Sequence, residues 1–159
     1  MSSKHTDNLV RLNGRTFLPE EVASLAIAVA MEKKAFRPVL LDLRSQGAFT
    51  EYFALVSASN GRQVGAVAEG IRMFFKQTFG INPIAVDGME SLTWVLIDYG
   101  FLFIHVFQEP TRELYQLEQL WSKGRVVALN EGEVQSLFDD VKGMAKINAD
   151  AAAAAAAQY

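Results

Sequence analysis

The sequence predicts a single α/β domain. Segments whose apolar residues recur at helical spacing alternate with short β-rich runs, an order typical of helices packed against a sheet. The chain has 159 residues, 50% of them hydrophobic, which fits one domain with one core. We therefore expect one sheet with helices against it.

Three segments of different character divide the chain. Residues 1–18 are polar and without periodicity, so we expect a flexible N-terminal tail. Residues 19–122 carry the alternating pattern of the domain. Residues 123–159 are expected to form a partly helical, partly low-complexity extension, because the alanine run 151–157 favours helix but offers no side chains that specify a partner.

The first helix is predicted over residues 19–34. Pro19 occupies a first helical position, where its missing N–H costs little, and Glu20 and Glu21 place carboxylates in the positive first turn. Two short strands follow, at 39–41 and 52–57.

The second helix is predicted over residues 62–79, where the apolar residues return to helical period. Asn60 is the expected N-cap and Gly80 the expected stop. A brief strand at 84–86 comes next.

Residues 92–108 predict a β-hairpin around a two-residue turn, Tyr99–Gly100, with Asp98 facing Phe101. In that register one face is aliphatic and packs on helices. The other face combines aromatic, apolar and polar side chains: Trp94, Leu96, Asp98, Phe101, Phe103 and His105. A sheet that is apolar on both faces is either covered on both sides or binds something with one of them.

The remaining elements are a helix at 111–121, a short strand at 125–129 and a helix at 131–147. In the first of these helices, Leu114 and Leu117 are spaced for one face.

The composition excludes several kinds of site. There is no Cys, which excludes disulfides, thiolate metal sites and a cysteine nucleophile. A net charge of -3 disfavours sequence-independent binding to nucleic acid or to an anionic membrane. No stretch approaches the ~20 apolar residues that span a bilayer. We expect a soluble cytoplasmic protein.

No cofactor or metal is predicted. The chain has no P-loop, dinucleotide-binding or H-E-x-x-H motif, and His105 with carboxylates alone would make a poor zinc site. One enzymatic alternative stays open, a nucleotide-binding or nucleotidyltransferase-like protein that uses Asp42 and the helix start at Asn60 to Arg62. The chain lacks an Asp-x-Asp pair, and a capped helix start explains the same residues.

Aromatic residues point instead to an interface. Trp94, Tyr99, Tyr115 and Trp121 lie beside charged residues, and Trp and Tyr are the residue types that anchor protein interfaces. As a cluster they predict a binding face, and a homodimer through that face is a further hypothesis.

Three motifs at and after the hairpin resemble the ribosomal silencing factor family, also called Iojap-related. They are Trp94–Gly100 (WVLIDYG), His105–Phe107 (HVF) and Arg112–Trp121 (RELYQLEQLW). Upstream, further short motifs follow the family pattern in the same order: Lys34–Ala35, Leu41–Arg44, Thr50–Phe53 and Arg62–Val64. The resemblance covers roughly 19–122.

The resemblance implies a mixed sheet, nucleotidyltransferase-like in shape but without the catalytic residues. It also implies a translational repressor, not an enzyme, that binds the large ribosomal subunit through its protein fourteen. Bound there, it would block joining of the small subunit and lower translation when nutrients are scarce. An acidic chain suits a basic ribosomal protein.

The resemblance also supplies partner-binding residues, those that match family motif positions: Trp94, Asp98, His105, Arg112, Tyr115, Glu118 and Trp121. The hairpin geometry adds Leu96, Tyr99 and Phe103. We expect Trp94 to anchor the contact, Asp98 and Glu118 to pair with Lys or Arg of the partner, and Arg112 to hold the local fold. Phe101 replaces a usual acidic residue, which is expected to make the face more apolar.

Overall fold

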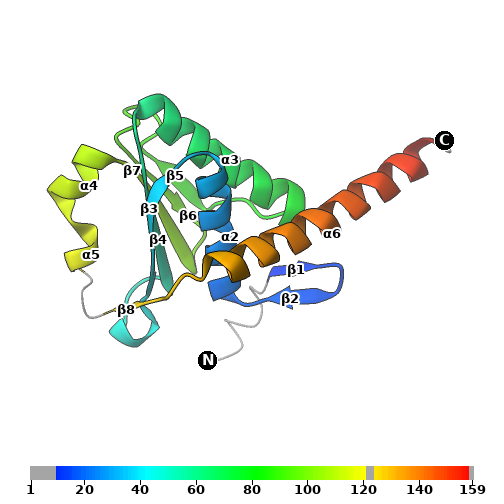
Figure 1. Cartoon of the computed structure of the whole chain (residues 1–159), viewed down its shortest axis with the longest axis horizontal. Coiled ribbons are helices and arrows are strands. Elements are labelled where there is room, and N and C mark those ends of the chain that lie inside the picture. Colours follow the sequence, from blue (N-terminus) through cyan, green and yellow to red (C-terminus); the bar gives the residue numbers. More distant parts are fainter. Residues whose placement is uncertain (1–9, 121–123, 158–159) are drawn as a thin grey trace.

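The computed structural model describes residues 10–120 and 124–157. A six-stranded mixed sheet in the order β5-β6-β7-β4-β3-β8 forms the centre of the domain. In Figure 1, α2, α3 and α6 lie on one side of this sheet and α4 and α5 on the other. The predicted α/β domain with a mixed sheet flanked by helices is confirmed.

The elements, in chain order, are β1 (Val10–Leu12), β2 (Arg15–Phe17), α2 (Pro19–Glu32), β3 (Phe36–Asp42), the short 3-10 helix η1 (Arg44–Gln46), β4 (Tyr52–Ala58), α3 (Gly61–Phe79), β5 (Ala85–Asp87), β6 (Trp94–Asp98), β7 (Leu102–Gln108), α4 (Glu109–Tyr115), α5 (Leu117–Leu120), β8 (Arg125–Val126) and α6 (Glu131–Ala157).

The β1–β2 hairpin corrects the expectation of a flexible tail for residues 10–17, while residues 1–9 of the predicted tail lie outside the described residues. Val10 pairs with Phe17 across the hairpin, and Phe17 is fully buried with its ring 5.4 Å from that of Phe79. The turn is Asn13–Gly14, both with positive φ, which suits a tight hairpin. Strands of three residues are too short to show a period, so this Asn-Gly pair was the available signal.

Helices α2 and α3 begin and end within two residues of the predicted positions. Leu18 N–H donates to the Glu21 carboxylate over 2.9 Å at the start of α2, which has Pro19 in its first turn. Asn60 caps α3 by accepting from Gln63 N–H over 2.9 Å, and Gly80 ends it with φ 68°. Both helices pack their apolar sides into the main core.

Strand β4 lies in the middle of the sheet and is buried along its whole length. It pairs antiparallel with β3 and parallel with β7, from Tyr52 beside Leu102 to Ala58 beside Gln108. Burial on both sides explains its continuous apolar sequence.

The β6–β7 hairpin has a longer turn than predicted. Asp98 faces Phe103 instead of Phe101, and Tyr99 N–H donates to Leu102 O over 2.9 Å to close the turn. Asp98 also accepts from Gly100 N–H over 2.7 Å, a local bond that the sequence pattern did not reveal. The register differs by two residues, so each strand residue keeps its predicted face. Phe101 moves into the turn and packs on the main core, so it does not extend the opposite face.

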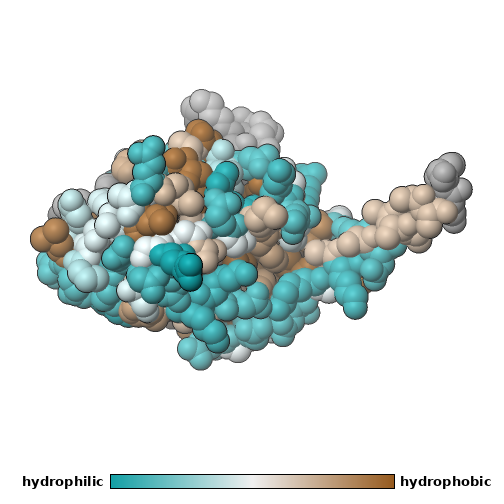
Figure 2. All heavy atoms as spheres, turned by 90° about the horizontal axis from the view of Figure 1, so that it is seen from above, coloured by the Kyte–Doolittle hydropathy of each residue, from teal (hydrophilic) through white to brown (hydrophobic). Residues whose placement is uncertain are grey.

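The C-terminal elements differ in length from the prediction. The helix expected at 111–121 is split by Gln116, which has φ 46°, into α4 and α5. Strand β8 has only two residues, and α6 continues to Ala157 instead of ending at Ile147. Alanine is the strongest helix former, which explains the continuation. The last two turns of α6 are exposed and extend away from the rest of the domain (Figure 2).

Among the helices of the described residues, none is long and apolar enough to cross a membrane.

Candidate functional site

The side of the sheet opposite α2 and α3 carries a second, smaller apolar cluster, which we call the aromatic face. Its rings touch one another in a continuous series: Phe49, Phe103, Phe53, His105, Phe107, Trp94 and Tyr115. At one end Phe49 is 66% exposed and lies 5.0 Å from Phe103. At the other end Tyr115 is 57% exposed and lies 5.1 Å from Trp94. The face is therefore buried in its middle and open to solvent at both ends.

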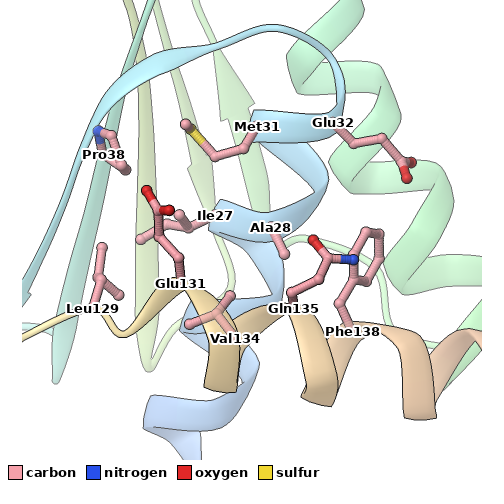
Figure 3. A pocket seen from close by; sticks show the side chains of 10 residues that line it. All are labelled: Ile27, Ala28, Met31, Glu32, Pro38, Leu129, Glu131, Val134, Gln135 and Phe138. Atoms are coloured by element: carbon pink, nitrogen blue, oxygen red, sulfur yellow. The ribbon is translucent and has the colours of Figure 1, made fainter.

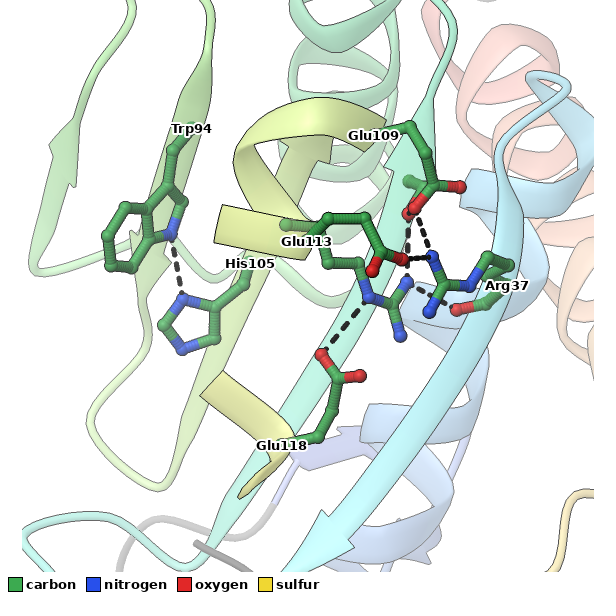
Figure 4. Close-up of polar contacts among 8 residues, drawn as sticks. Arg37, Trp94, His105, Glu109, Glu113 and Glu118 are labelled. Atoms are coloured by element: carbon green, nitrogen blue, oxygen red, sulfur yellow. Dashed lines mark hydrogen bonds and ion pairs between the residues drawn. The ribbon is translucent and has the colours of Figure 1, made fainter. Parts of the chain in front are cut away.

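Trp94 is held in place by a hydrogen bond to a buried histidine. Its Nε1–H donates to His105 Nδ1 over 3.1 Å (Figure 4). Burial lowers the pKa of His105 to about 3, so the ring is neutral near pH 7 with its proton on Nε2. His105 is 3% exposed, and no partner for Nε2 is present within the described residues. His105 thus orients Trp94 and does not itself reach a docking partner.

Acidification is expected to destabilise the fold through His105. Because the pKa of His105 is about 3 in the fold and 6.5 for a free imidazole, the unfolded chain binds more protons between these values. The contribution of neutral His105 to the free energy of unfolding is fully present above pH 6.5 and is lost as the pH falls towards 3. At pH 5.5 the free energy of unfolding should be lower by about 1.4 kcal/mol than at pH 7.5, measured by urea unfolding.

A His105→Phe variant provides the control. It keeps an aromatic ring among the others but does not titrate, so its stability should stay level between pH 7.5 and 5.5. An equal fall in both proteins would show that His105 is not the group responsible.

A buried arginine joins the α4–α5 segment to the sheet. The Arg112 side chain is 1% exposed, and its Nη1 donates to Arg37 O over 2.6 Å and to Ser57 Oγ over 2.9 Å. Its Nε donates to Glu118 Oε1 over 3.1 Å (Figure 4). One guanidinium thus links α4 with β3, β4 and α5, as the expected role of Arg112 in the local fold requires.

A second arginine, Arg37, is partly exposed and bonds two carboxylates of α4. Arg37 Nη1 donates to Glu113 Oε1 over 2.6 Å and also bonds Glu109, whose carboxylate accepts from Ser57 Oγ over 3.3 Å. Arg37 has φ 53°, at a point where the pairing of β3 with β4 is irregular. The network fixes the position of Tyr115, which ends α4.

The structure brings most of the predicted site residues to this face. Trp94, Leu96, Asp98 and Phe103 are half-buried on one side of the hairpin, and Tyr115 lies against Trp94. Asp98 is engaged locally with Gly100 N–H.

Five predicted contact residues need correction or lie outside the description, and the first of them is His105, which is 3% exposed and supports Trp94 from within. Tyr99 is 8% exposed and packs 5.1 Å from Phe75 in the main core, because the longer turn directs it there. Arg112 is buried, and Glu118 is paired with it rather than free for a partner. Trp121 lies outside the described residues.

Two exposed residues were missed. Phe49 sits in the connection between β3 and β4, and the sequence analysis placed no element there. Leu114 was expected on one face with Leu117, yet it is 77% exposed while Leu117 is buried. The break at Gln116 rotates the two residues apart, and single-residue breaks leave little trace in a short apolar pattern.

The residues of the enzymatic alternative are already engaged. At the start of α3, Asn60 Oδ1 and Gln63 Oε1 accept the backbone N–H groups of Gln63 and Ser59, the groups that a phosphate would use. The Arg44 guanidinium, followed by Arg125, holds the pKa of the Asp42 carboxyl well below its usual range. No group of three or more potential metal ligands occurs among the residues described.

Comparison with protein families identifies the family. The model of the family described as "Ribosomal silencing factor during starvation" matches residues 18–158. The chain belongs to this family. The family match extends beyond residues 19–122, where the sequence motifs lie, and includes α6.

Curated relatives carry the same family name. The chain is 31% identical over 110 residues to a protein named ribosomal silencing factor RsfS from Halalkalibacterium halodurans, covering 69% of this chain and 93% of that protein. It is 28% identical to the RsfS of Bacillus subtilis, covering 71% and 95%. A mouse relative, 23% identical over 62% of this chain and 44% of its own length, is named mitochondrial assembly of ribosomal large subunit protein 1.

Solved structures agree with the fold. A crystal structure from Chromobacterium violaceum has a TM-score of 0.64 and 26% identity, covering 71% of this chain and 92% of that one. A crystal structure from Bacillus halodurans has a TM-score of 0.61 and 31% identity, covering 69% and 99%. The mixed-sheet domain is thus shared with proteins of known structure.

Proposed function

We propose that this protein represses translation by binding the large ribosomal subunit through its ribosomal protein fourteen and so keeping the small subunit from joining. In this proposal it acts in the cytoplasm when nutrients are limiting. It acts by occupying space, without catalysis, so affinity and position determine the effect.

The observation that carries the proposal is the aromatic face in a member of the ribosomal silencing factor family. Exposed aromatic and aliphatic side chains next to a well-packed aromatic centre are typical of protein interfaces. Phe49, Leu114 and Tyr115 provide the exposed part, and Trp94 and Phe103 the half-buried part. The name of the mouse relative also points to the large subunit.

The charge of the chain fits a basic partner. The net charge is -3, and Asp98 lies half-buried beside the aromatic face. Complementary charge speeds encounter and fixes orientation more than it adds affinity. Binding should therefore weaken as salt rises, while the aromatic contacts persist.

Co-sedimentation with separated ribosomal subunits tests the proposal. We expect the protein to sediment with large subunits and not with small ones, and to lower the yield of joined ribosomes when added before mixing. Sedimentation with neither subunit, or binding that leaves joining unchanged, would contradict it.

Self-association through the same face is the competing arrangement. A homodimer would show twice the chain mass in light scattering, and would compete with the ribosome if both used the aromatic face. A dimer that dissociates on replacing Trp94, without any subunit binding, would replace the ribosomal proposal.

A further inference from the structure

A cavity of about 310 Å³ lies between α2 and the first turns of α6 (Figure 3). Both helices and the segment before α6 contribute its apolar lining: Ile27, Ala28, Met31, Leu129, Val134 and Phe138. Ile27, Ala28 and Phe138 are buried, whereas Met31 is 39% exposed. The cavity lies on the side of the sheet opposite the aromatic face, so it is separate from the proposed ribosome contact.

Two polar side chains of α6 line the same space. Glu131 and Gln135 are four residues apart, so they share a helix face with Val134 and Phe138. In Figure 3 the Glu131 side chain reaches from α6 towards α2. Polar side chains of α6 beside apolar groups of both helices would orient a ligand that has one polar end.

Two carboxylates line the cavity, and only one of them has a cationic side chain as its partner in the described part of the chain. Glu32, at the other side of the cavity, pairs with Lys142 at 3.3 Å. Glu131 forms no ion pair with any residue that the structure describes. Glu131 is exposed to solvent in the first turn of α6, so it is a hydrated carboxylate at the mouth of the cavity. It favours a cation with an apolar body over an anion, by the modest amount of a surface ion pair.

We propose that this cavity binds a small amphipathic amine. The apolar part of the ligand fills the space between Ile27, Val134 and Phe138, and its ammonium group pairs with Glu131. The cavity volume is at the lower end of the ~300–1,000 Å³ typical of small-molecule sites, so the ligand is small. Water against such apolar walls has few hydrogen-bond partners, and its displacement favours binding.

Titration with 2-phenylethylamine, followed by NMR on the full chain, tests the proposal. We expect saturable shifts at Ile27, Met31 and Val134 with a dissociation constant on the order of 1 mM. The neutral 2-phenylethanol should bind about threefold more weakly, and the anionic 3-phenylpropionate should bind least. Shifts that never saturate, or equal binding of amine and carboxylate, would overturn the proposal.

Three variants make the test specific. Glu131→Gln should remove the preference for the amine over the alcohol, whereas Glu133→Gln, a matched change on the same helix that does not line this cavity, should retain it. Val134→Trp, at a half-buried position, should fill the cavity and abolish binding of both the amine and the alcohol. Amine binding that survives both Glu131→Gln and Val134→Trp unchanged would place the ligand elsewhere and refute the assignment.

Discussion

An Arg112→Met variant is expected to lose about 3 kcal/mol of unfolding free energy, near the lower end of what breaking a buried ion pair costs. The change removes a guanidinium that is 1% exposed and leaves three acceptors without their donor: Arg37 O, Ser57 Oγ and Glu118 Oε1. Glu118 is 29% exposed, so water can reach it in part and moderates the loss. Urea unfolding of the variant and the parent chain measures the difference.

Two companion variants separate charge from geometry. Arg112→Lys keeps the charge, but a single ammonium cannot reproduce the fork of donors, so its stability should lie between those of the parent and Arg112→Met. Adding Glu118→Gln to Arg112→Met should recover part of the loss, because no partly buried carboxylate is then left without its cation. Stability of Arg112→Met within about 0.5 kcal/mol of the parent would show that the network is not structural.

The Arg112→Met variant should also change the proposed docking face. Arg112 fixes α4, and α4 ends at Tyr115, whose ring packs on Trp94. Loss of the network should therefore loosen the exposed end of the aromatic face before the main core unfolds, since the core lies on the other side of the sheet.

Elements with a strong period or a cap were predictable from the sequence. Helices α2 and α3 begin at Pro19 and after Asn60 as expected, because local hydrogen bonds of the helix ends determine these positions. The faces of the β6–β7 hairpin were also predictable, because alternation survives an even shift in register.

The features that could not be predicted depend on contacts between residues that a local sequence pattern does not reveal. The hairpin turn is set by Asp98 bonding Gly100 N–H, and the β1–β2 hairpin is held by Phe17 packing on Phe79 from a distant helix. In the candidate site, the sequence indicated Trp94, Tyr115 and a role of Arg112 in the local fold. It did not indicate that His105 would be buried behind Trp94, or which groups Arg112 would bond. Burial of a polar side chain depends on which distant elements cover it, here β3, β4 and α5.

A Trp94→Ala variant is expected to bind large ribosomal subunits at least about 30-fold more weakly, the equivalent of roughly 2 kcal/mol for an aromatic anchor. The change removes the ring that contacts Phe107 at 5.0 Å and Tyr115 at 5.1 Å. Tyr115 then loses its support, so both the anchor and its exposed neighbour are affected. Quantitative co-sedimentation over a range of large-subunit concentrations measures the change.

Controls distinguish loss of contact from loss of fold. Trp94→Phe keeps a ring but cannot donate to His105 Nδ1, so its binding should fall less than that of Trp94→Ala. Met73→Ala removes a 49% exposed apolar side chain on α3, across the sheet from the aromatic face, and should leave binding unchanged. If a folded Trp94→Ala protein sediments with large subunits as fully as the parent, the aromatic face is not the contact. If Met73→Ala weakens binding instead, the ribosome is bound through the helical side of the sheet.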